Sequence, residues 1–166
     1  MKWSSKKGFT TVEIIVATTI VLIFAVIAVP LVSHLFENHR LRAAGEGLYQ
    51  ELRLARLEAI RQRTDVKVIF QTGGSWCYGA TTATTCDCSI ADSCNLGESS
   101  YLEHKNVSLS LAGFASDTIT FEGIRGLADD SGEAIFTLNS KSIRVHIGRL
   151  GNLSICSDDV GGYGSC

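Results

Sequence analysis

The residues in this 166-residue sequence that are best suited to chemistry are its six cysteines, because cysteine can ligate a metal ion or form a disulfide. A structural zinc site typically has paired C-x-x-C knuckles, which are missing here. Disulfides in an oxidising compartment are therefore the favoured interpretation. Four cysteines lie close together and two flank a glycine-rich tail: Cys77, Cys86, Cys88 and Cys94, then Cys156 and Cys166.

The tail between Cys156 and Cys166 reads SDDVGGYGS and has no means of ordering itself. We therefore predict a bond between these two cysteines, which would stabilise the fold by about 2–3 kcal/mol. The other four cysteines would pair among themselves, and the sequence leaves their connectivity open.

A search for catalytic groups finds none with a convincing arrangement. No nucleophile has a base at a recognisable spacing, and Gly161–Gly164 indicates a turn in the tail rather than a phosphate-binding loop. The histidines are interpreted as surface residues rather than ligands: His34, His39, His104 and His146. The sequence therefore predicts no enzyme activity, no cofactor and no metal site.

Glu13 stands at the head of a long apolar stretch. Ile14 to Val32 contains no charged residue, and as a helix it would extend about 28 Å, close to the bilayer core of about 30 Å. A secretory signal would have a shorter apolar core and a small-residue cleavage site, neither of which is evident. The basic residues of Met1–Gly8 predict a cytoplasmic amino terminus with the remainder exported. A carboxylate beside lipid is costly unless paired, so Glu13 is a candidate functional residue.

The element that would carry Glu13 is one helix from near Phe9 to Arg63, about 80 Å long if straight. Pro30 predicts a kink near Val26–Pro30, because proline removes a helical hydrogen bond. Gly45 and Gly47 suggest a soft spot. In the second half, apolar residues recur every three or four positions, which predicts one buried stripe: Leu41, Ala44, Leu48, Leu52, Ala55 and Ala59.

After Thr64 the sequence changes to the short alternating segments that are typical of strands. A hairpin is expected around Gly73-Gly74, a loop without periodicity from Gly79 to Ser100, and a turn at Asn139-Ser140-Lys141. The fold class is therefore α+β, with the helix packed on an antiparallel sheet. The expected strands are 66–70, 107–111, 118–121, 134–138, 142–147 and 153–156.

The leader and the start of the helix resemble a known processing signal. Lys6-Lys7-Gly8-Phe9-Thr10-Thr11-Val12-Glu13 is similar to the class III signal of type IV pilins and pseudopilins, with Thr11 and Val12 in place of the usual aliphatic pair. The resemblance implies that a prepilin peptidase cuts after Gly8 and methylates Phe9. It also implies that Glu13 neutralises the amino terminus of a neighbouring subunit within the filament.

The carboxy-terminal part resembles pseudopilin H and the FimT and FimU minor pilins, through Ile119–Gly126, the strands after it, and Gly148-Arg149. DNA-binding FimT-like pilins carry Gly-Arg-x-Arg, whereas this chain has Gly148-Arg149-Leu150-Gly151. Lys141, Arg144 and Arg149 remain candidates for DNA binding. Residues 64–166 nevertheless hold six Lys or Arg against twelve Asp or Glu, which disfavours a nucleic-acid partner.

Together these features predict a minor pilin of a type IV pilus that takes part in pilus assembly or tip initiation. The alternatives are the pseudopilin H of type II secretion and a DNA-binding minor pilin. The expected partners are other major and minor pilins or pseudopilins, the prepilin peptidase and inner-membrane lipid, with the head in the periplasm until it reaches the cell surface. The expected parts are a leader (1–8), a transmembrane helix (9–36), an amphipathic helix (37–63) and a disulfide-containing β-rich head (64–166).

Overall fold

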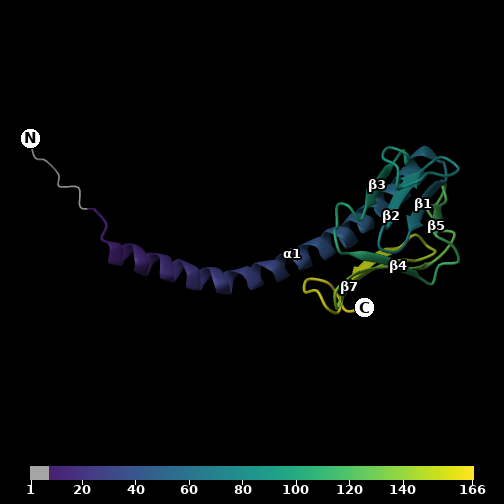
Figure 1. Ribbon diagram of the computed structural model, residues 1–166. Helices are drawn as coiled ribbons and strands as arrows, with labels where there is room; N and C mark the ends of the chain where they lie inside the picture. Colours follow the sequence, from purple (N-terminus) through teal and green to yellow (C-terminus); the bar gives the residue numbers. More distant parts are fainter. Residues whose placement is uncertain (1–7) are drawn as a thin grey trace, which may run out of the picture. The chain divides into compact units, whose positions relative to one another are not determined.

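The computed structural model describes residues 8–166, except for the side chains of residues 26–35. The chain divides into two compact units, Met1–Glu37 and Asn38–Cys166. Helix α1 (Thr11–Gln62) contributes to both units and precedes all of the strands (Figure 1). The strands are β1 (Val66–Gln71), β2 (Cys77–Thr81), β3 (Gly97–Ser100), β4 (Ser108–Ala112), β5 (Thr118–Phe121), β6 (Gly132–Leu138), β7 (Lys141–Ile147) and β8 (Leu153–Cys156).

The second half of α1 packs on the strands of the larger unit. The predicted stripe is confirmed, because its six members are each no more than 1% exposed: Leu41, Ala44, Leu48, Leu52, Ala55 and Ala59. The helix ends where Arg63 adopts a left-handed backbone with φ of 53°. Burial of one apolar face therefore fixes which side of the helix meets the sheets.

The strands form two antiparallel sheets of four strands each, where the sequence predicted a single sheet. The first sheet has the order β3-β2-β1-β5 and the second the order β4-β6-β7-β8. Leu138 pairs with Lys141, so Asn139 and Ser140 form the two-residue turn between β6 and β7, near the position predicted. Asn139 has a φ of 55°, as such tight hairpin turns require.

The prediction of a loop from Gly79 to Ser100 is partly wrong. Strand β2 continues to Thr81, and Gly97–Ser100 forms β3, which pairs with β2 from Cys77 to Ala80. The sequence of β3, GESS, has no apolar alternation, because all four residues are only half-buried at the edge of the sheet. Backbone pairing, rather than side-chain patterning, defines this strand.

Trp76 belongs to the core and is fully buried. Its indole nitrogen Nε1 donates a hydrogen bond of 2.7 Å to the carbonyl oxygen of Val107. The ring of Phe136 meets it edge-on with centroids 5.2 Å apart, and His104 stacks on it at 5.9 Å. The tryptophan therefore joins the segment before β2 to β6 and to the segment before β4.

Gly45 lets α1 approach β7 closely. A Cβ atom at this position would lie 2.6 Å from Cγ2 of Ile143, well inside ordinary contact distance. A Cβ at Gly47 would lie 3.1 Å from the hydroxyl oxygen of Tyr78. The two glycines predicted to weaken the helix thus have packing roles against both sheets.

Candidate functional site

The start of α1 holds Glu13 in a reciprocal cap with Thr10. The Thr10 hydroxyl Oγ1 accepts a hydrogen bond from the backbone N–H of Glu13 at 3.2 Å. In return, the Glu13 carboxylate accepts one from the backbone N–H of Thr10 at 3.5 Å. This is a capping box, which explains why the helix begins at Thr11, two residues later than predicted. The role of Thr10 was not predicted from the sequence, although the Thr-x-x-Glu spacing is its signal.

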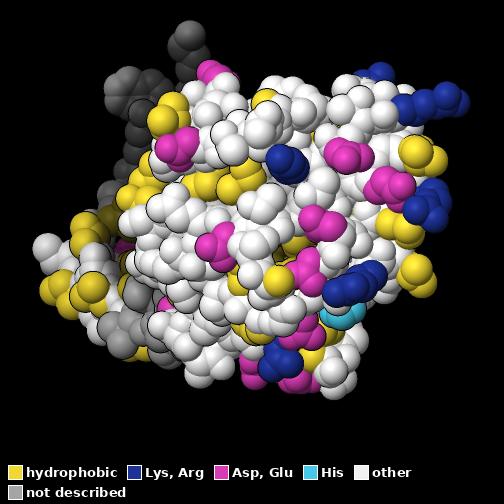
Figure 2. All heavy atoms as spheres, turned by 90° about the vertical axis from the view of Figure 1, so that its right-hand side faces the viewer, with side chains coloured by type: hydrophobic (Ala, Val, Ile, Leu, Met, Phe, Trp, Pro, Cys, Tyr) yellow, Lys and Arg dark blue, Asp and Glu magenta, His cyan; other side chains and the backbone are white. Residues whose placement is uncertain are grey.

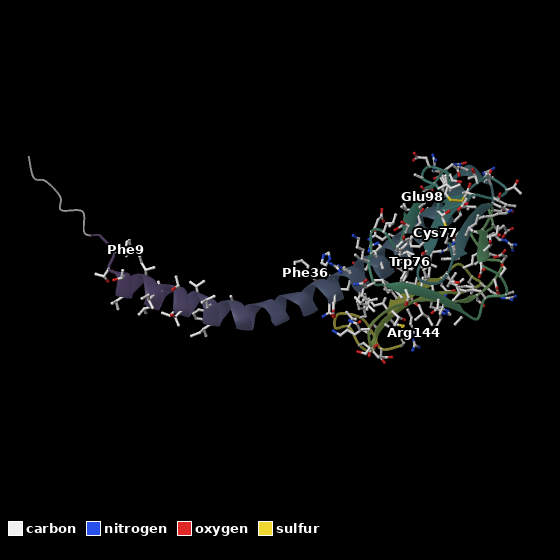
Figure 3. The ribbon with its side chains drawn as sticks, viewed as in Figure 1. Phe9, Phe36, Trp76, Cys77, Glu98 and Arg144 are labelled. Atoms are coloured by element: carbon white, nitrogen blue, oxygen red, sulfur yellow. A yellow bond between two sulfur atoms is a disulfide. The ribbon has the colours of Figure 1, made fainter. Side chains whose placement is uncertain are left out.

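The predicted processing site lies just before this cap. Gly8 and Phe9 are exposed, and the Phe9 side chain is 81% exposed (Figure 3). Residues 1–7, which carry the predicted basic leader, lie outside the described part of the chain. The first turns of the helix present large exposed apolar side chains on all sides: Val12, Ile14, Ile15, Val16, Ile20, Val21, Leu22, Ile23 and Phe24.

The hydroxyl groups of two threonines within this apolar segment donate hydrogen bonds to backbone carbonyl oxygens of the preceding turn. Thr18 Oγ1 donates to the carbonyl oxygens of Ile14 and Ile15 at 3.0 Å, and Thr19 Oγ1 donates to that of Ile15 at 2.7 Å. In the part of the chain that the structure describes, no helix meets the length and apolarity needed to cross a membrane. The helix continues through Pro30. The predicted kink near Val26–Pro30 falls among residues whose side chains the structure does not describe, so it stays a prediction.

The carboxy-terminal tail forms a closed ring. Cys156 and Cys166 are joined by a disulfide, and the backbone N–H of Ser157 donates to the carbonyl oxygen of Gly164 across it. Val160 is 3% exposed and belongs to the core. The ring is thus anchored both by a covalent bond and by an apolar side chain.

The same ring contacts α1. The Arg42 guanidinium donates to the carbonyl oxygen of Gly161 and lies over the ring of Tyr163, 5.7 Å from its centroid. The Tyr163 hydroxyl donates to the carboxylate of Glu46. Partial burial, together with Glu46, raises the pKa of Tyr163 to about 12. The tyrosine therefore stays protonated at physiological pH and keeps this hydrogen bond.

Two further disulfides hold the segment between β2 and β3. They join Cys77 to Cys88 and Cys86 to Cys94, the connectivity that the sequence left open. Glu98 of β3 also holds this segment, because its carboxylate accepts the backbone N–H of Asp92 at 2.7 Å and that of Cys94 at 3.2 Å. Figure 3 shows Glu98 near Cys77 on the head.

The three basic residues considered for DNA binding do not line up. Lys141 donates from Nζ to Oδ1 of Asn38 at 2.7 Å, and Arg149 lies 3.8 Å from a carboxylate oxygen of Asp130. Arg144 is three positions after Lys141 in β7, so their side chains leave opposite faces of the strand. On the face shown in Figure 2, basic and acidic side chains are interspersed without a continuous basic patch.

Two of the four histidines make defined contacts, His39 is exposed, and the side chain of His34 lies outside the described ones. Burial lowers the pKa of His104, which stacks on Trp76, and His146 lies 4.0 Å from Glu133. Among the described residues, no group of three or more His, Cys, Asp or Glu side chains is placed to hold a metal ion.

Comparisons with known proteins find one matching family model and two similar crystal structures. The family model of type II transport protein GspH matches residues 44–151. Two crystal structures of the type IV minor pilin FimU from Pseudomonas aeruginosa share the fold. One has a TM-score of 0.54 at 19% identity, covering 69% of this chain and 91% of FimU. The other has a TM-score of 0.56 at 20% identity, covering 72% and 90%. No curated protein matches the chain.

The family match covers well over half of the chain, including the end of α1 from Ala44 onward and strands β1 to β7. The structural likeness independently gives a pilin-like α+β fold. The chain therefore belongs to the type II transport protein GspH family and is a minor pilin or pseudopilin.

Proposed function

We propose that the chain is a structural subunit, without catalytic activity, of a type IV pilus, where it acts as a minor pilin in pilus assembly or tip initiation. The observation that carries this proposal is the combination of an exposed apolar helix with a single acid at its first turn. Phe9 to Phe24 offers apolar side chains that find no partner within their own unit among the described residues. Such a surface is stable only when lipid or other apolar helices cover it.

In this proposal a prepilin peptidase removes residues 1–8 and methylates Phe9. The helix anchors the subunit in the inner membrane with the head in the periplasm. During assembly, Glu13 exchanges its local bond to the Thr10 N–H for the charged amino terminus of a neighbouring major or minor pilin. An ion pair of this kind is strong in a low-dielectric environment, and a lone carboxylate there is costly.

Replacing Glu13 with alanine tests the docking role. We expect Glu13→Ala to leave the amount of membrane-bound protein unchanged and to lower its incorporation into sheared filaments by about tenfold or more, the loss expected when a buried charge loses its partner. Immunoblots of the membrane and filament fractions measure both quantities. The control is Thr11→Ala, which changes a helix residue two positions before Glu13 and keeps the carboxylate.

Thr10→Ala separates docking from capping. It removes the cap while leaving the Glu13 charge, and losing an N-cap destabilises a helix end by about 1 kcal/mol. If both variants lost incorporation equally, Glu13 would act only through the local helix cap, and its proposed role as a docking residue would be wrong.

The pseudopilin H of type II secretion is the second candidate, and the family match with type II transport protein GspH favours it. The two candidates differ in where the subunit ends up. A pilus subunit is expected in filaments sheared from the cell surface, and its deletion would reduce surface pili. A secretion pseudopilin would be absent from those filaments, and its deletion would retain exported enzymes in the periplasm. DNA binding is not favoured, because Lys141 and Arg149 already have polar or acidic partners.

A further inference from the structure

An open groove of about 580 Å³ runs beside the exposed face of α1, within the larger unit. Its walls include Tyr49, Arg53 and Leu57 from the helix, Gly151 from the turn before β8 and Leu153 from the start of β8. Sheet order places β8 at an edge of the second sheet.

Large aliphatic side chains lie on the exposed face of the helix, where Leu57 and Ile60 line the groove together with two arginines. Leu54, Leu57 and Ile60 are spaced by three residues and are 60%, 58% and 40% exposed. This second stripe is separate from the buried one that packs on the sheets. Three large aliphatic side chains gathered on one exposed face favour a contact with another apolar group.

Two guanidinium groups make the groove positive. Arg56 is held in place, because its Nε donates to the carbonyl oxygen of Gly126 at 3.0 Å and its Nη2 to that of Leu150 at 3.4 Å. Arg53 lies over the ring of Tyr49 at 5.9 Å and contacts no carboxylate among the described residues. A ligand for this groove should therefore combine an aliphatic side chain with carboxylates.

The disulfide-held loop Cys86–Cys94, here called the acidic knob, has this chemistry. Ile90 is 59% exposed and lies between Asp87 and Asp92. The knob keeps one shape, because a disulfide joins its ends and Glu98 accepts two of its backbone N–H groups. A rigid loop loses little conformational entropy when it binds.

We propose that the acidic knob of one subunit docks into the Arg53–Leu57 groove of a second copy of this chain. Ile90 would pack against Leu57 and Ile60, and Asp92 would pair with Arg53. Knob and groove are different surfaces, so the contact is heterologous, and repeating it adds subunits in one direction instead of closing a dimer. The contact goes beyond the proposed function, because it does not involve Glu13 or the anchor.

A loop of nine residues covers less area than a standard stable interface, so the contact is weak and depends on the high local concentration of subunits in one assembly. Covalent trapping suits such a contact. A benzoylphenylalanine photo-crosslinker at position 57, in the full chain in detergent micelles at low salt, should give a covalent dimer. Mass spectrometry should then place the second attachment within residues 86–94. The control carries the same crosslinker at Leu102, which is 63% exposed.

Charge exchange decides whether the proposed pair is in contact. Arg53→Glu and Asp92→Asn should each lower the dimer yield by about threefold, as loss of an exposed ion pair at the rim of an interface would. Combining Arg53→Glu with Asp92→Lys should restore at least about half of the yield. Non-reducing peptide maps verify that all three disulfides are intact in each variant.

Three outcomes would overturn this inference: attachment outside residues 86–94, a yield that Arg53→Glu leaves unchanged, or no recovery in the exchanged pair. Repeating the experiment with Glu13→Ala keeps the two proposals distinguishable. If the dimer persists while filament incorporation is lost, the docking role of Glu13 stands and the knob contact is independent of it. If incorporation persists while the dimer is absent, both proposals fail.

Discussion

Substitution of Gly45 by alanine tests how the helix meets the second sheet. The new Cβ would lie 2.6 Å from Cγ2 of Ile143 and 3.6 Å from Cδ1 of Ile155. Ordinary contacts between carbon atoms are about 3.5–4.0 Å, so α1 and β7 would have to separate by about 1 Å. Because the other side of β7 is paired with β8, the shift would extend to the edge of that sheet.

Two opposing effects determine the size of the change. Alanine in place of glycine inside a helix stabilises it by about 1 kcal/mol. Overpacking in a well-packed core destabilises by about 1–3 kcal/mol. The expected net effect is therefore a loss of up to about 2 kcal/mol in the free energy of unfolding. For a unit of this size, 1 kcal/mol corresponds to about 4 °C in Tm, so Gly45→Ala should lower Tm by up to about 8 °C.

Thermal unfolding of the full chain in detergent, followed by near-ultraviolet circular dichroism, measures this change. Gly47→Ala is the matched control, because its Cβ would lie 3.1 Å from a hydroxyl oxygen that moves more easily, and we expect a smaller effect. In an Ile143→Ala background, which removes the clashing methyl group, Gly45→Ala should stabilise instead. A destabilisation of the same size in both backgrounds would refute the close-contact explanation.

Three further changes have clear expected outcomes. Cys156→Ser with Cys166→Ser should cost about 2–3 kcal/mol and expose the tail to proteases, and an unchanged Tm and proteolysis rate would contradict the anchoring role of the ring. Burial raises the pKa of Glu51, so the ionised form of this side chain is disfavoured in the folded state. The contribution of Glu51 to the free energy of unfolding therefore falls as pH rises through the raised pKa. Glu51→Gln should therefore raise the free energy of unfolding at pH 7 by less than about 1 kcal/mol, with the gain disappearing near pH 4, whereas an equal gain at both pH values would exclude titration as the cause. Trp76→Phe should lower the free energy of unfolding, measured by denaturant titration, by about 1–3 kcal/mol, because the Val107 carbonyl loses its buried hydrogen-bond donor. A decrease below about 0.5 kcal/mol would show that this hydrogen bond contributes little to stability.

The parts of the fold that were predictable have a strong period in the sequence. The stripe from Leu41 to Ala59 recurs at helical spacing, and all six of its members are buried. The alternating residues of β6 and β7 are likewise buried at every second position along most of their length. In both cases one buried face imposes the pattern, so the pattern reveals the element.

The stretch from Thr82 to Ser100 could not be predicted in the same way. Its order depends on two disulfides and on the Glu98 carboxylate, which join residues whose spacing carries no period. The division into two sheets could not be predicted from the sequence either, because strand lengths and turns do not determine which strands pair. Likewise, Gly45 was interpreted as a weak point, since only the neighbouring Ile143 reveals the need for a missing side chain.

The cap at Thr10 and Glu13 bears on how a subunit with this anchor could wait before assembly. A lone carboxylate beside an apolar helix is unfavourable, yet here it is bonded to the backbone of its own first turn. That bond is long, at 3.5 Å, and the Glu13 side chain is exposed, so a cationic amino terminus could displace it without breaking the helix. Thr10 would continue to cap the helix through its own hydroxyl. Under the proposed function, the Thr-x-x-Glu spacing therefore lets one acid serve the isolated subunit and the filament in turn.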